Sequence, residues 1–391
     1  MPQAALPPYP DADLFHVVDM LPVHEKERYQ RTREFLQERI REQSIEYWNR
    51  DEFAFGLLAE MAKFGLGELQ LDGSSKLFKG LMYVEIARAD VSLSALAGIH
   101  NELIVGMIHE LGSAEQQERW LPALRTFDAI GAFALTEPEH GSDIAGGLAT
   151  TARRDGDSWV INGAKRWIGA ATLADFALVW ARDEADGEVK GFIVESDRPG
   201  YKATKIEHKI GLRIMQNADI TLDEVRIPAG NLLPGATDFS QANSLLRDSR
   251  AWVGWQAAGI QLGAFDIARA YSLERQQFGK PLAKFQLVQQ QLAEMLGNAH
   301  CSLALMVELA RVQEAGKLEM VQAALAKSTT TRLARQSVAM GRALLGGNGV
   351  TTDFEMAKLF CDAEILYTYE GSYEINSLIV ARAVTGVSAF V

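Results

Sequence analysis

Apolar residues recur every three or four positions through most of residues 1–125, and this spacing predicts amphipathic helices. The stretch 90–111 is apolar around most of its circumference, so we expect a helix buried in the core. Ser113 and Gln116 have the spacing of a capping box, which predicts that a further helix begins there. Helices are expected at 22–51, 52–64, 76–89, 90–111 and from 113 onward.

The pattern changes near Phe127, where long periodic stretches give way to short alternating or apolar runs. Turn signals such as Asn162-Gly163 and Pro199-Gly200 separate these runs. Strands are expected at 129–135, 148–154, 159–162, 176–181, 190–194 and 219–225. The middle of the chain is therefore predicted to be an all-β module.

Long helical patterns then resume, and each is long enough to cross a domain. They are expected at 244–276, 285–316 and 319–345, with short helices at 353–360 and 372–386. A glycine-rich break at 346–349 ends the third of them. The chain is thus predicted to be an α+β protein with an all-α domain at 1–127, a β domain at 128–238 and a helical domain at 239–391.

The chain has 391 residues and a net charge of −12, with a pI near 5.2. That balance argues against nucleic-acid binding, which rests on a basic face. The seven histidines do not cluster with metal-ligand spacing, so no metal is expected. Walker A, G-x-G-x-x-G, G-x-S-x-G and H-E-x-x-H sequences are absent.

Cys301 and Cys361 lie in apolar helical patterns and form no C-x-x-C pair, so we expect two reduced, buried thiols. The N-terminus lacks the basic start and apolar run of a signal peptide. No apolar stretch is expected to reach the length of a membrane span, and the C-terminus matches no peroxisomal signal. A cytoplasmic protein without a membrane span is the expectation.

Glu370 lies between an aromatic residue and a glycine, just before the last helical pattern. Gly371 and Ser372 are plausible entry residues for that helix. A carboxylate among apolar groups has its charged form disfavoured, which raises its pKa towards the range of a useful base. The stretch alone favours a solvated helix-cap acid over a base.

Four further motifs each allow two interpretations. Residues 133–143 form a strand and a donor-rich loop that could hold a planar heterocycle, or a plain strand end. Trp167, in the run 165–169, could pack on a ring system or belong to the core. Arg275 could bind a pyrophosphate, or its positive charge could offset the negative end of the helix dipole at a helix C-terminus. The glycines at 346–349 could bind an anion or stop a helix.

Together these motifs resemble the acyl-CoA dehydrogenase family in order and spacing, from about residue 20 to residue 390. The chain looks most similar to the branch of glutaryl-CoA dehydrogenase and the short-chain, plant-type acyl-CoA oxidases. Residues 209–213 and 216–217 look particularly like the oxidases. The resemblance implies an N-terminal all-α domain, a central β-barrel or sandwich domain and a C-terminal four-helix-bundle domain.

The resemblance also implies FAD, bound without a covalent link. The residues that match the family's FAD contacts are Phe133, Leu135, Thr136, Ser142, Trp167, Ile168, Gly169, Arg275, Phe278, Gln286, Leu345, Gly346, Gly347, Ser372 and Phe390. Arg275, Gln286 and the stretch 343–347 match positions that reach FAD in a neighbouring subunit. A homotetramer, assembled as a dimer of dimers, is therefore implied.

Glu370 matches the family's catalytic base, which removes the α-proton of an acyl-CoA while the β-hydrogen leaves as hydride to flavin N5, giving a trans-2-enoyl-CoA. Residues that match substrate contacts are Ser142, Arg250, Tyr369, Gly371 and Ser94. Arg250 suits a phosphate-bearing tail. Electron-transfer flavoprotein is the implied electron acceptor.

Two departures from the family pattern bear on substrate and acceptor. Ser94 stands where glutaryl-CoA dehydrogenase uses an arginine for the distal carboxylate, so a monocarboxylic substrate without decarboxylation is expected, with glutaryl-CoA dehydrogenase as an alternative. Gly169 replaces a threonine found in many dehydrogenases and occurs in the oxidases, so an oxidase that makes hydrogen peroxide is a second alternative. A non-catalytic acyl-CoA-binding homologue is a third. Bulk at 93–97, Trp252 and Tyr369 suggests short or branched acyl chains.

Overall fold

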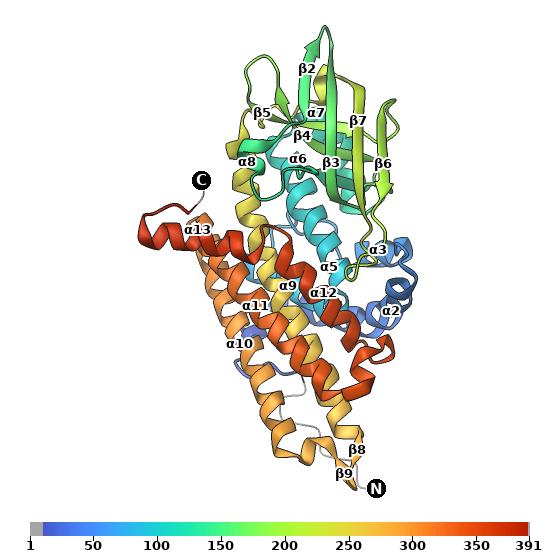
Figure 1. Cartoon of the computed structure of the whole chain (residues 1–391), viewed down its shortest axis with the longest axis vertical. Helices are drawn as coiled ribbons and strands as arrows, with labels where there is room; N and C mark the ends of the chain where they lie inside the picture. The colour runs from blue at the N-terminus through green and yellow to red at the C-terminus, as the bar shows by residue number, and fades with distance from the viewer. Residues whose placement is uncertain (1–10, 390–391) are drawn as a thin grey trace.

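The computed structural model describes residues 11–389, without the side chains of residues 242 and 245. Figure 1 shows helices at both ends of the chain and a sheet formed by its middle part. The predicted α+β fold with an N-terminal helical domain, a central β domain and a C-terminal helical domain is confirmed.

The N-terminal domain is helical, as its periodicity predicts. Its elements are η1 (Val17–Met20), α1 (Val23–Phe35), η2 (Leu36–Ile40), α2 (Arg41–Arg50), α3 (Phe55–Ala62), α4 (Lys76–Ala89), α5 (Val91–Gly98), η3 (Ile99–Val105), α6 (Gly106–Leu111) and α7 (Ala114–Arg125). The Ser113 side chain accepts from Gln116 N–H and the Gln116 side chain accepts from Ser113 N–H, which confirms the predicted capping box.

The continuous helix Val91–Leu111 is the buried core helix that its apolar composition predicts, with a π-helical turn at η3. By length and composition alone it could cross a membrane, so the expectation that no stretch reaches that length was wrong. However, 89% of its apolar window is buried inside the protein, as in the core helix of a globular domain.

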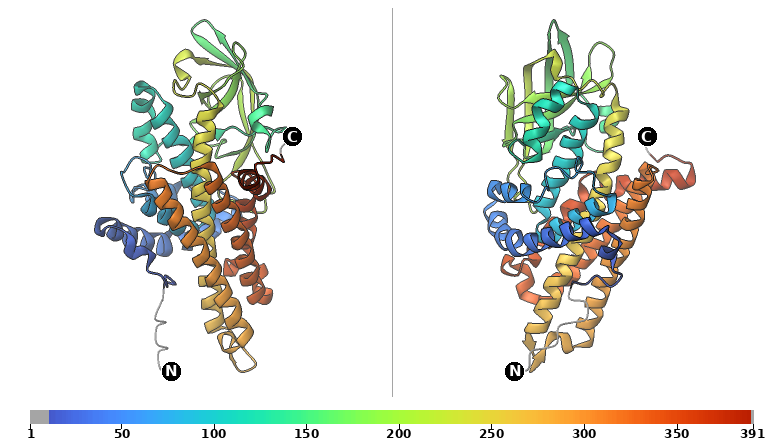
Figure 2. Two further views of the ribbon diagram at one scale, coloured as in Figure 1. Left: turned by 90° about the vertical axis from the view of Figure 1, so that its left-hand side faces the viewer. Right: turned by 180° about the vertical axis from the view of Figure 1, so that it is seen from behind.

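The central sheet has the strand order β1-β4-β2-β3-β7-β6, and β5 pairs with β4. Its strands are β1 (Gly131–Ala134), β2 (Thr151–Asp155), β3 (Ser158–Gly169), β4 (Phe176–Asp183), β5 (Val189–Glu195), β6 (Tyr201–Lys205) and β7 (Asn217–Pro228), with the short helix α8 (Ile144–Gly147) after β1. β1 runs parallel to β4, with Phe133 opposite Leu178, whereas β3 and β7 are antiparallel. Seen from behind in Figure 2, helices α5–α7 cover one face of this sheet.

The C-terminal domain contains long helices, of which α9 extends from beside the sheet to the end of the molecule at β8 and β9 (Figure 1). Its elements, after η4 (Ala229–Asn231), are α9 (Phe239–Glu274), β8 (Gln276–Gln277), β9 (Lys280–Pro281), η5 (Leu282–Lys284), α10 (Gln286–Glu314), α11 (Met320–Leu344), η6 (Gly346–Val350), η7 (Thr352–Phe354), α12 (Met356–Thr368) and α13 (Tyr373–Thr385). Helix α9 packs against α4, α10 and α11 and so joins the two helical domains.

Two tryptophans of α9 pack against glycines of the N-terminal domain. A Cβ atom at Gly80 of α4 would overlap the ring of Trp255, and one at Gly98 of α5 would overlap the ring of Trp252. Both indoles are almost fully buried. The glycines therefore allow the close approach of α4 and α5 to α9.

The cysteines differ from expectation. Cys301 is exposed and Cys361 is only half-buried, so the prediction of two buried thiols was wrong. Cys301 lies on the outward side of α10, where a single apolar residue does not mark the buried face.

Candidate functional site

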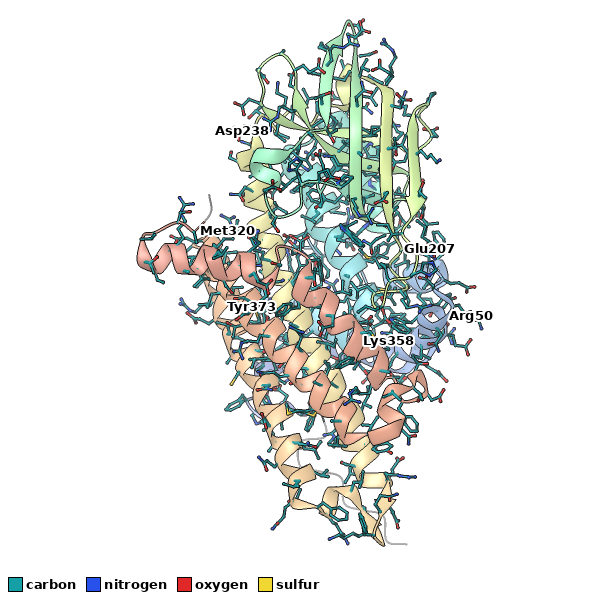
Figure 3. The ribbon with its side chains drawn as sticks, in the orientation of Figure 1. Arg50, Glu207, Asp238, Met320, Lys358 and Tyr373 are labelled. Atoms are coloured by element: carbon teal, nitrogen blue, oxygen red, sulfur yellow. The ribbon has the colours of Figure 1, made fainter. Side chains whose placement is uncertain are left out.

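Glu370 lies in a short connection between α12 and α13, which we call the carboxylate loop (residues 369–372). Glu370 has a φ of 55° and Gly371 a φ of 77°, so two consecutive residues adopt left-handed backbone conformations. Ser372 then caps α13, since its side chain accepts from Ile375 N–H as predicted. Ser372, not Glu370, is thus the helix cap, and the interpretation of Glu370 as a cap acid was wrong. Tyr373, labelled in Figure 3, is the first residue of α13.

The Glu370 carboxylate is held by a residue that the sequence pattern did not single out. Ser249 Oγ of α9 donates to Glu370 Oε2 at 2.5 Å. Burial raises the pKa of Glu370 above its usual range, whereas the Ser249 bond and the nearby charges of Arg250 and Lys327 lower it. The prediction of a raised pKa is confirmed in direction, and the raised value suits a base.

Lys327 of α11 is fully buried beneath the carboxylate loop. Its Nζ donates to Tyr367 O at 2.9 Å and to Gly371 O at 2.7 Å, on either side of Glu370. Burial lowers the pKa of Lys327 to about 7, which the charge of Glu370 partly opposes. Lys327 was also missed from the sequence, because a lysine in a regular helix is usually solvated.

Arg250 and Asn376 hold the same loop from α9 and α13. Asn376 Nδ2 donates to Gly371 O at 2.7 Å and to Ser372 O at 3.0 Å. Arg250 Nε donates in turn to Asn376 Oδ1 at 3.1 Å. The predicted substrate residue Arg250 is therefore largely buried beside Gly371, where it also contributes positive charge near Glu370.

Tyr369 and Ser94, both predicted substrate contacts, belong to one buried polar chain. The Tyr369 hydroxyl donates to Gln256 Oε1, and Gln256 Nε2 donates to Ser94 Oγ at 3.1 Å. Ser94 Oγ donates to Tyr83 O at 3.2 Å. The structure thus brings Ser94 to the Glu370 side of the molecule, and Gln256 is the connecting residue that sequence reasoning missed.

A second set of predicted residues lies where the loop after β1 meets β3. Arg166 N–H donates to Thr136 O at 2.8 Å, and Lys165 Nζ donates to Leu135 O at 3.0 Å and to Glu137 Oε1 at 2.8 Å. These bonds bring together the predicted flavin residues Phe133, Leu135, Thr136, Trp167, Ile168 and Gly169, with Ser142 exposed on the same loop. The buried pair of Lys165 and Glu137, which fixes this junction, carried no sequence signal.

Trp167 projects from this junction. The pairing of β3 with β7 shifts register between Lys165 and Ile168, and Trp167 has a φ of 66° within this irregularity. Its side chain is 53% exposed, so the core interpretation of Trp167 was wrong. The bulge turns the indole outward, where it offers a flat surface to a ring system.

A third set of predicted residues lies at the other end of the molecule. Arg275, Phe278, Gln286, Gly346 and Gly347 are exposed and Leu345 is buried, where α9 ends, α10 begins and α11 ends. Asn348 Nδ2 donates to Tyr271 OH at 3.0 Å and connects the two segments. Figure 1 shows the β8–β9 hairpin at the far end of the long helices from the sheet, so one chain does not bring this set to Glu370. Phe390 lies outside the described residues.

Comparison with known proteins places this arrangement in a family. Models of the N-terminal, middle and C-terminal domains of acyl-CoA dehydrogenase match residues 24–128, 132–225 and 239–385. The chain belongs to the acyl-CoA dehydrogenase family. The human mitochondrial short-chain specific acyl-CoA dehydrogenase is 36% identical to this family member over 330 residues. The matched region covers 81% of this chain and 80% of the human protein. Acryloyl-CoA reductase (NADH) of Anaerotignum propionicum is 34% identical over 84% of this chain and 86% of its own.

Solved structures of this acyl-CoA dehydrogenase family agree with the fold over nearly the whole chain. Glutaryl-CoA dehydrogenase from Mycobacterium smegmatis gives a TM-score of 0.93 at 35% identity and covers 97% of this chain and 99% of its own. A glutaryl-CoA dehydrogenase from the same organism in complex with FADH2 gives 0.93 at 33% identity, with the same coverage. Butyryl-CoA dehydrogenase from Megasphaera elsdenii gives 0.87 at 28% identity, over 93% of this chain and 98% of its own.

The protein is an FAD-dependent flavoenzyme of this family, and its own residues fit that cofactor. The indole of Trp167 is exposed at the bulge, and the backbone N–H of its neighbour Arg166 binds the carbonyl of Thr136, a half-buried hydroxyl residue, so both belong to the same junction. A flat apolar surface next to polar groups suits a planar heterocycle with a polar edge.

Proposed function

We propose that this enzyme oxidises a short or branched monocarboxylic acyl-CoA to its trans-2-enoyl-CoA, with Glu370 as the base that removes the α-proton. The observation that carries the proposal is the environment of Glu370. Burial raises the pKa of its carboxyl group, one hydroxyl binds the carboxylate, and three helices hold its loop. A base with these properties suits an acid as weak as the α-carbon of a thioester.

The residues of the chain supply acid–base chemistry and orientation. Glu370 accepts the α-proton, and Ser249 orients the accepting carboxylate. Bound FAD supplies the acceptor for the β-hydrogen, which leaves with its electron pair. Gly371 has a φ of 77°, which favours glycine, and a side chain there would meet Asn376 and Arg250, so the glycine allows these two residues to hold the loop closely. Positive charge on Lys327 and Arg250 favours the ionised form of Glu370, which is the form that accepts the proton.

The surroundings of Ser94 support a monocarboxylic substrate. The Ser94 hydroxyl bonds to protein groups, and a serine carries no charge for a distal carboxylate. Arg88, one helix away, is bound to Asp266 at 2.7 Å and to Glu85 at 3.4 Å. An arginine paired with two carboxylates is a poor ligand for a third.

Electron-transfer flavoprotein is the proposed acceptor, with oxygen as the alternative that Gly169 raises. The space that a side chain at Gly169 would occupy is filled by the methyl group of Met215, with Ile99 close by. The glycine therefore opens no gap in the packing at this point, which favours a dehydrogenase. A chain in the structure of the electron transferring flavoprotein of Acidaminococcus fermentans is similar, with a TM-score of 0.88 at 28% identity.

A homotetramer is the proposed assembly, since the third set of predicted cofactor residues lies far from Glu370 within one chain. Large apolar side chains are exposed at the same end, namely Leu273, Phe278, Leu287 and Val350. Phe278 is 92% exposed. Exposed apolar side chains gathered near one end of a protein are typical of a contact with another chain. A second copy would bring Arg275 and Gln286 to the flavin of its neighbour.

The test is anaerobic mixing of the yellow, FAD-loaded enzyme with butyryl-CoA. We expect the flavin absorbance to bleach in the wild type, and Glu370→Gln to keep FAD but lose the reaction by at least about 100-fold. Glu374→Gln removes an exposed acid four residues further on and serves as the matched control. Full activity of Glu370→Gln would refute the base. Parallel assays with oxygen and with electron-transfer flavoprotein identify the acceptor.

A further inference from the structure

Trp252 of α9 is fully buried and connects the carboxylate loop with the N-terminal domain. Its ring centroid lies 5.8 Å from that of Tyr369, which precedes Glu370, and 6.3 Å from that of Tyr83 on α4. The hydroxyl of Tyr369 is fixed on Gln256, one turn along α9 from Trp252. Trp252 therefore packs directly behind the aromatic neighbour of the base.

A cavity of about 70 Å³ lies next to Trp252. Trp252, Trp255 and Tyr83 form the aromatic wall of this cavity, and Tyr369 and Glu370 are not among its lining residues. Much of the remaining lining is polar, namely Gln70, Lys76, Lys79, Glu102, Glu110, Asp248 and Gln313. The cavity is thus separate from the space at the base. Trp252 is a wall of the cavity and also contacts Tyr369, so it separates the two spaces.

A line of contacts connects this tryptophan with the flavin side of the site. A side chain at Gly169 would meet Ile99, and one at the preceding residue, Gly98, would overlap the ring of Trp252. The contacts thus run from Gly169 through Ile99 and Gly98 to Trp252, and from there to Tyr369. The reacting carbons must lie between Glu370 and Gly169. Acyl carbons beyond them point into the protein and meet this line.

We propose that Trp252 is the specificity-determining residue that ends the acyl site, and that a smaller side chain there would join the site to the cavity behind it. This inference rests on the proposed function, because it takes Glu370 and the flavin side at Gly169 as the two sides of the reacting bond. The position of Trp252 explains why the proposed substrate has a short acyl group. Removal of the indole vacates apolar space between Tyr83, Tyr369 and Gly98, and each methylene that enters this space contributes roughly fourfold to affinity.

The experiment compares butyryl-, hexanoyl- and octanoyl-CoA in the FAD-loaded wild type and in Trp252→Val. We expect kcat/KM of the wild type to fall from butyryl- to octanoyl-CoA, and Trp252→Val to raise the octanoyl-to-butyryl ratio at least about tenfold. Binding of S-octyl-CoA, a thioether without an acidic α-proton, is measured by calorimetry as a readout independent of turnover. It should tighten relative to S-butyl-CoA by a similar factor.

Trp255→Val is the matched control, because Trp255 is equally buried in α9 and lines the same cavity but packs on Gly80 instead of Gly98. It should leave the octanoyl-to-butyryl ratio unchanged. An unchanged ratio in Trp252→Val, or an equal rise in Trp255→Val, would overturn the inference. If Trp252→Val does not fold, Trp252→Met must show a smaller rise in both ratios. A wild type that oxidises no acyl-CoA would instead overturn the proposed function.

Discussion

Ser249→Ala removes the hydroxyl that binds the Glu370 carboxylate at 2.5 Å. The hydroxyl has one hydrogen and two acceptors within reach, Glu370 Oε2 and Leu246 O at 2.9 Å. The charged carboxylate is the stronger acceptor of the two, so when Glu370 is ionised the hydrogen of Ser249 is directed to Glu370 Oε2. Its bond lowers the pKa of Glu370, and its loss should therefore raise that pKa further.

A hydrogen bond to a charged group contributes about 1.5–3 kcal/mol. Because the bond to the ionised form is the stronger of the two that Ser249 can make, its loss decreases the ionised fraction of Glu370 by at most roughly ten- to 100-fold on the acid side of the titration. Flavin reduction by butyryl-CoA, measured by anaerobic stopped flow against pH, should fall by up to this factor at acid pH. At alkaline pH, where Glu370 is ionised in both proteins, the two rates should converge.

Ser272→Ala is the matched control for Ser249→Ala. Ser272 is also buried in α9, and its hydroxyl donates to Arg269 O within the helix. This variant should leave the pH profile unchanged. A Ser249→Ala profile that coincides with the wild type, or a uniform loss at all pH values with no shift, would refute the view that Ser249 sets the ionisation of Glu370.

Three further changes test other parts of the structure. Lys327→Met should move the acid limb of the pH profile of flavin reduction to higher pH, since the charge of Lys327 favours ionised Glu370. It should also speed hydrogen exchange in residues 367–372, because the bond to Gly371 O is lost. An unchanged pH profile would contradict the role of the Lys327 charge. Burial lowers the pKa of His100 from 6.5 to about 4, so the free energy of unfolding of the wild type should fall by about 3 kcal/mol through this residue as the pH falls between those values. In urea unfolding measured against pH, His100→Gln should not show this decrease. Met215→Ala should increase hydrogen peroxide formation relative to turnover with electron-transfer flavoprotein, and an unchanged ratio would show that packing at Gly169 does not limit oxygen.

Periodicity in the sequence predicts the order of helices and strands well, because each element buries one continuous face or stripe. The helix predicted at 319–345 is α11 (Met320–Leu344) in the structure. Ser113 and Ser372 cap the N-termini of helices, as is typical of serine. Local chemistry is enough in these cases, since the partner of each cap lies three residues away. The pattern at 90–111 was correct in type but did not indicate the π-helical turn within it.

The contacts that define the site could not be predicted in the same way. Ser249 and Glu370 are separated by 121 residues, and Lys327 is bound to carbonyls 40 and 44 residues away. A serine or lysine within a helical pattern gives no sign of such a contact, because the same residue is usually solvated. Trp167 needed a register shift between β3 and β7 to turn outward, and a shift of that kind depends on the partner strand.

The pattern of contacts explains how the loop can be rigid while its carboxylate stays free to react. Lys327 and Asn376 bind carbonyl oxygens of the loop, so they fix its backbone without pairing with the carboxylate. In the part of the chain that the structure describes, the direct hydrogen-bond partner of that carboxylate is Ser249. When Glu370 takes up a proton, the Ser249 oxygen can accept it in a hydrogen bond, and the Ser249 hydrogen can turn to Leu246 O. Ser249 can therefore bind both protonation states, and the loop need not move when the proton is transferred.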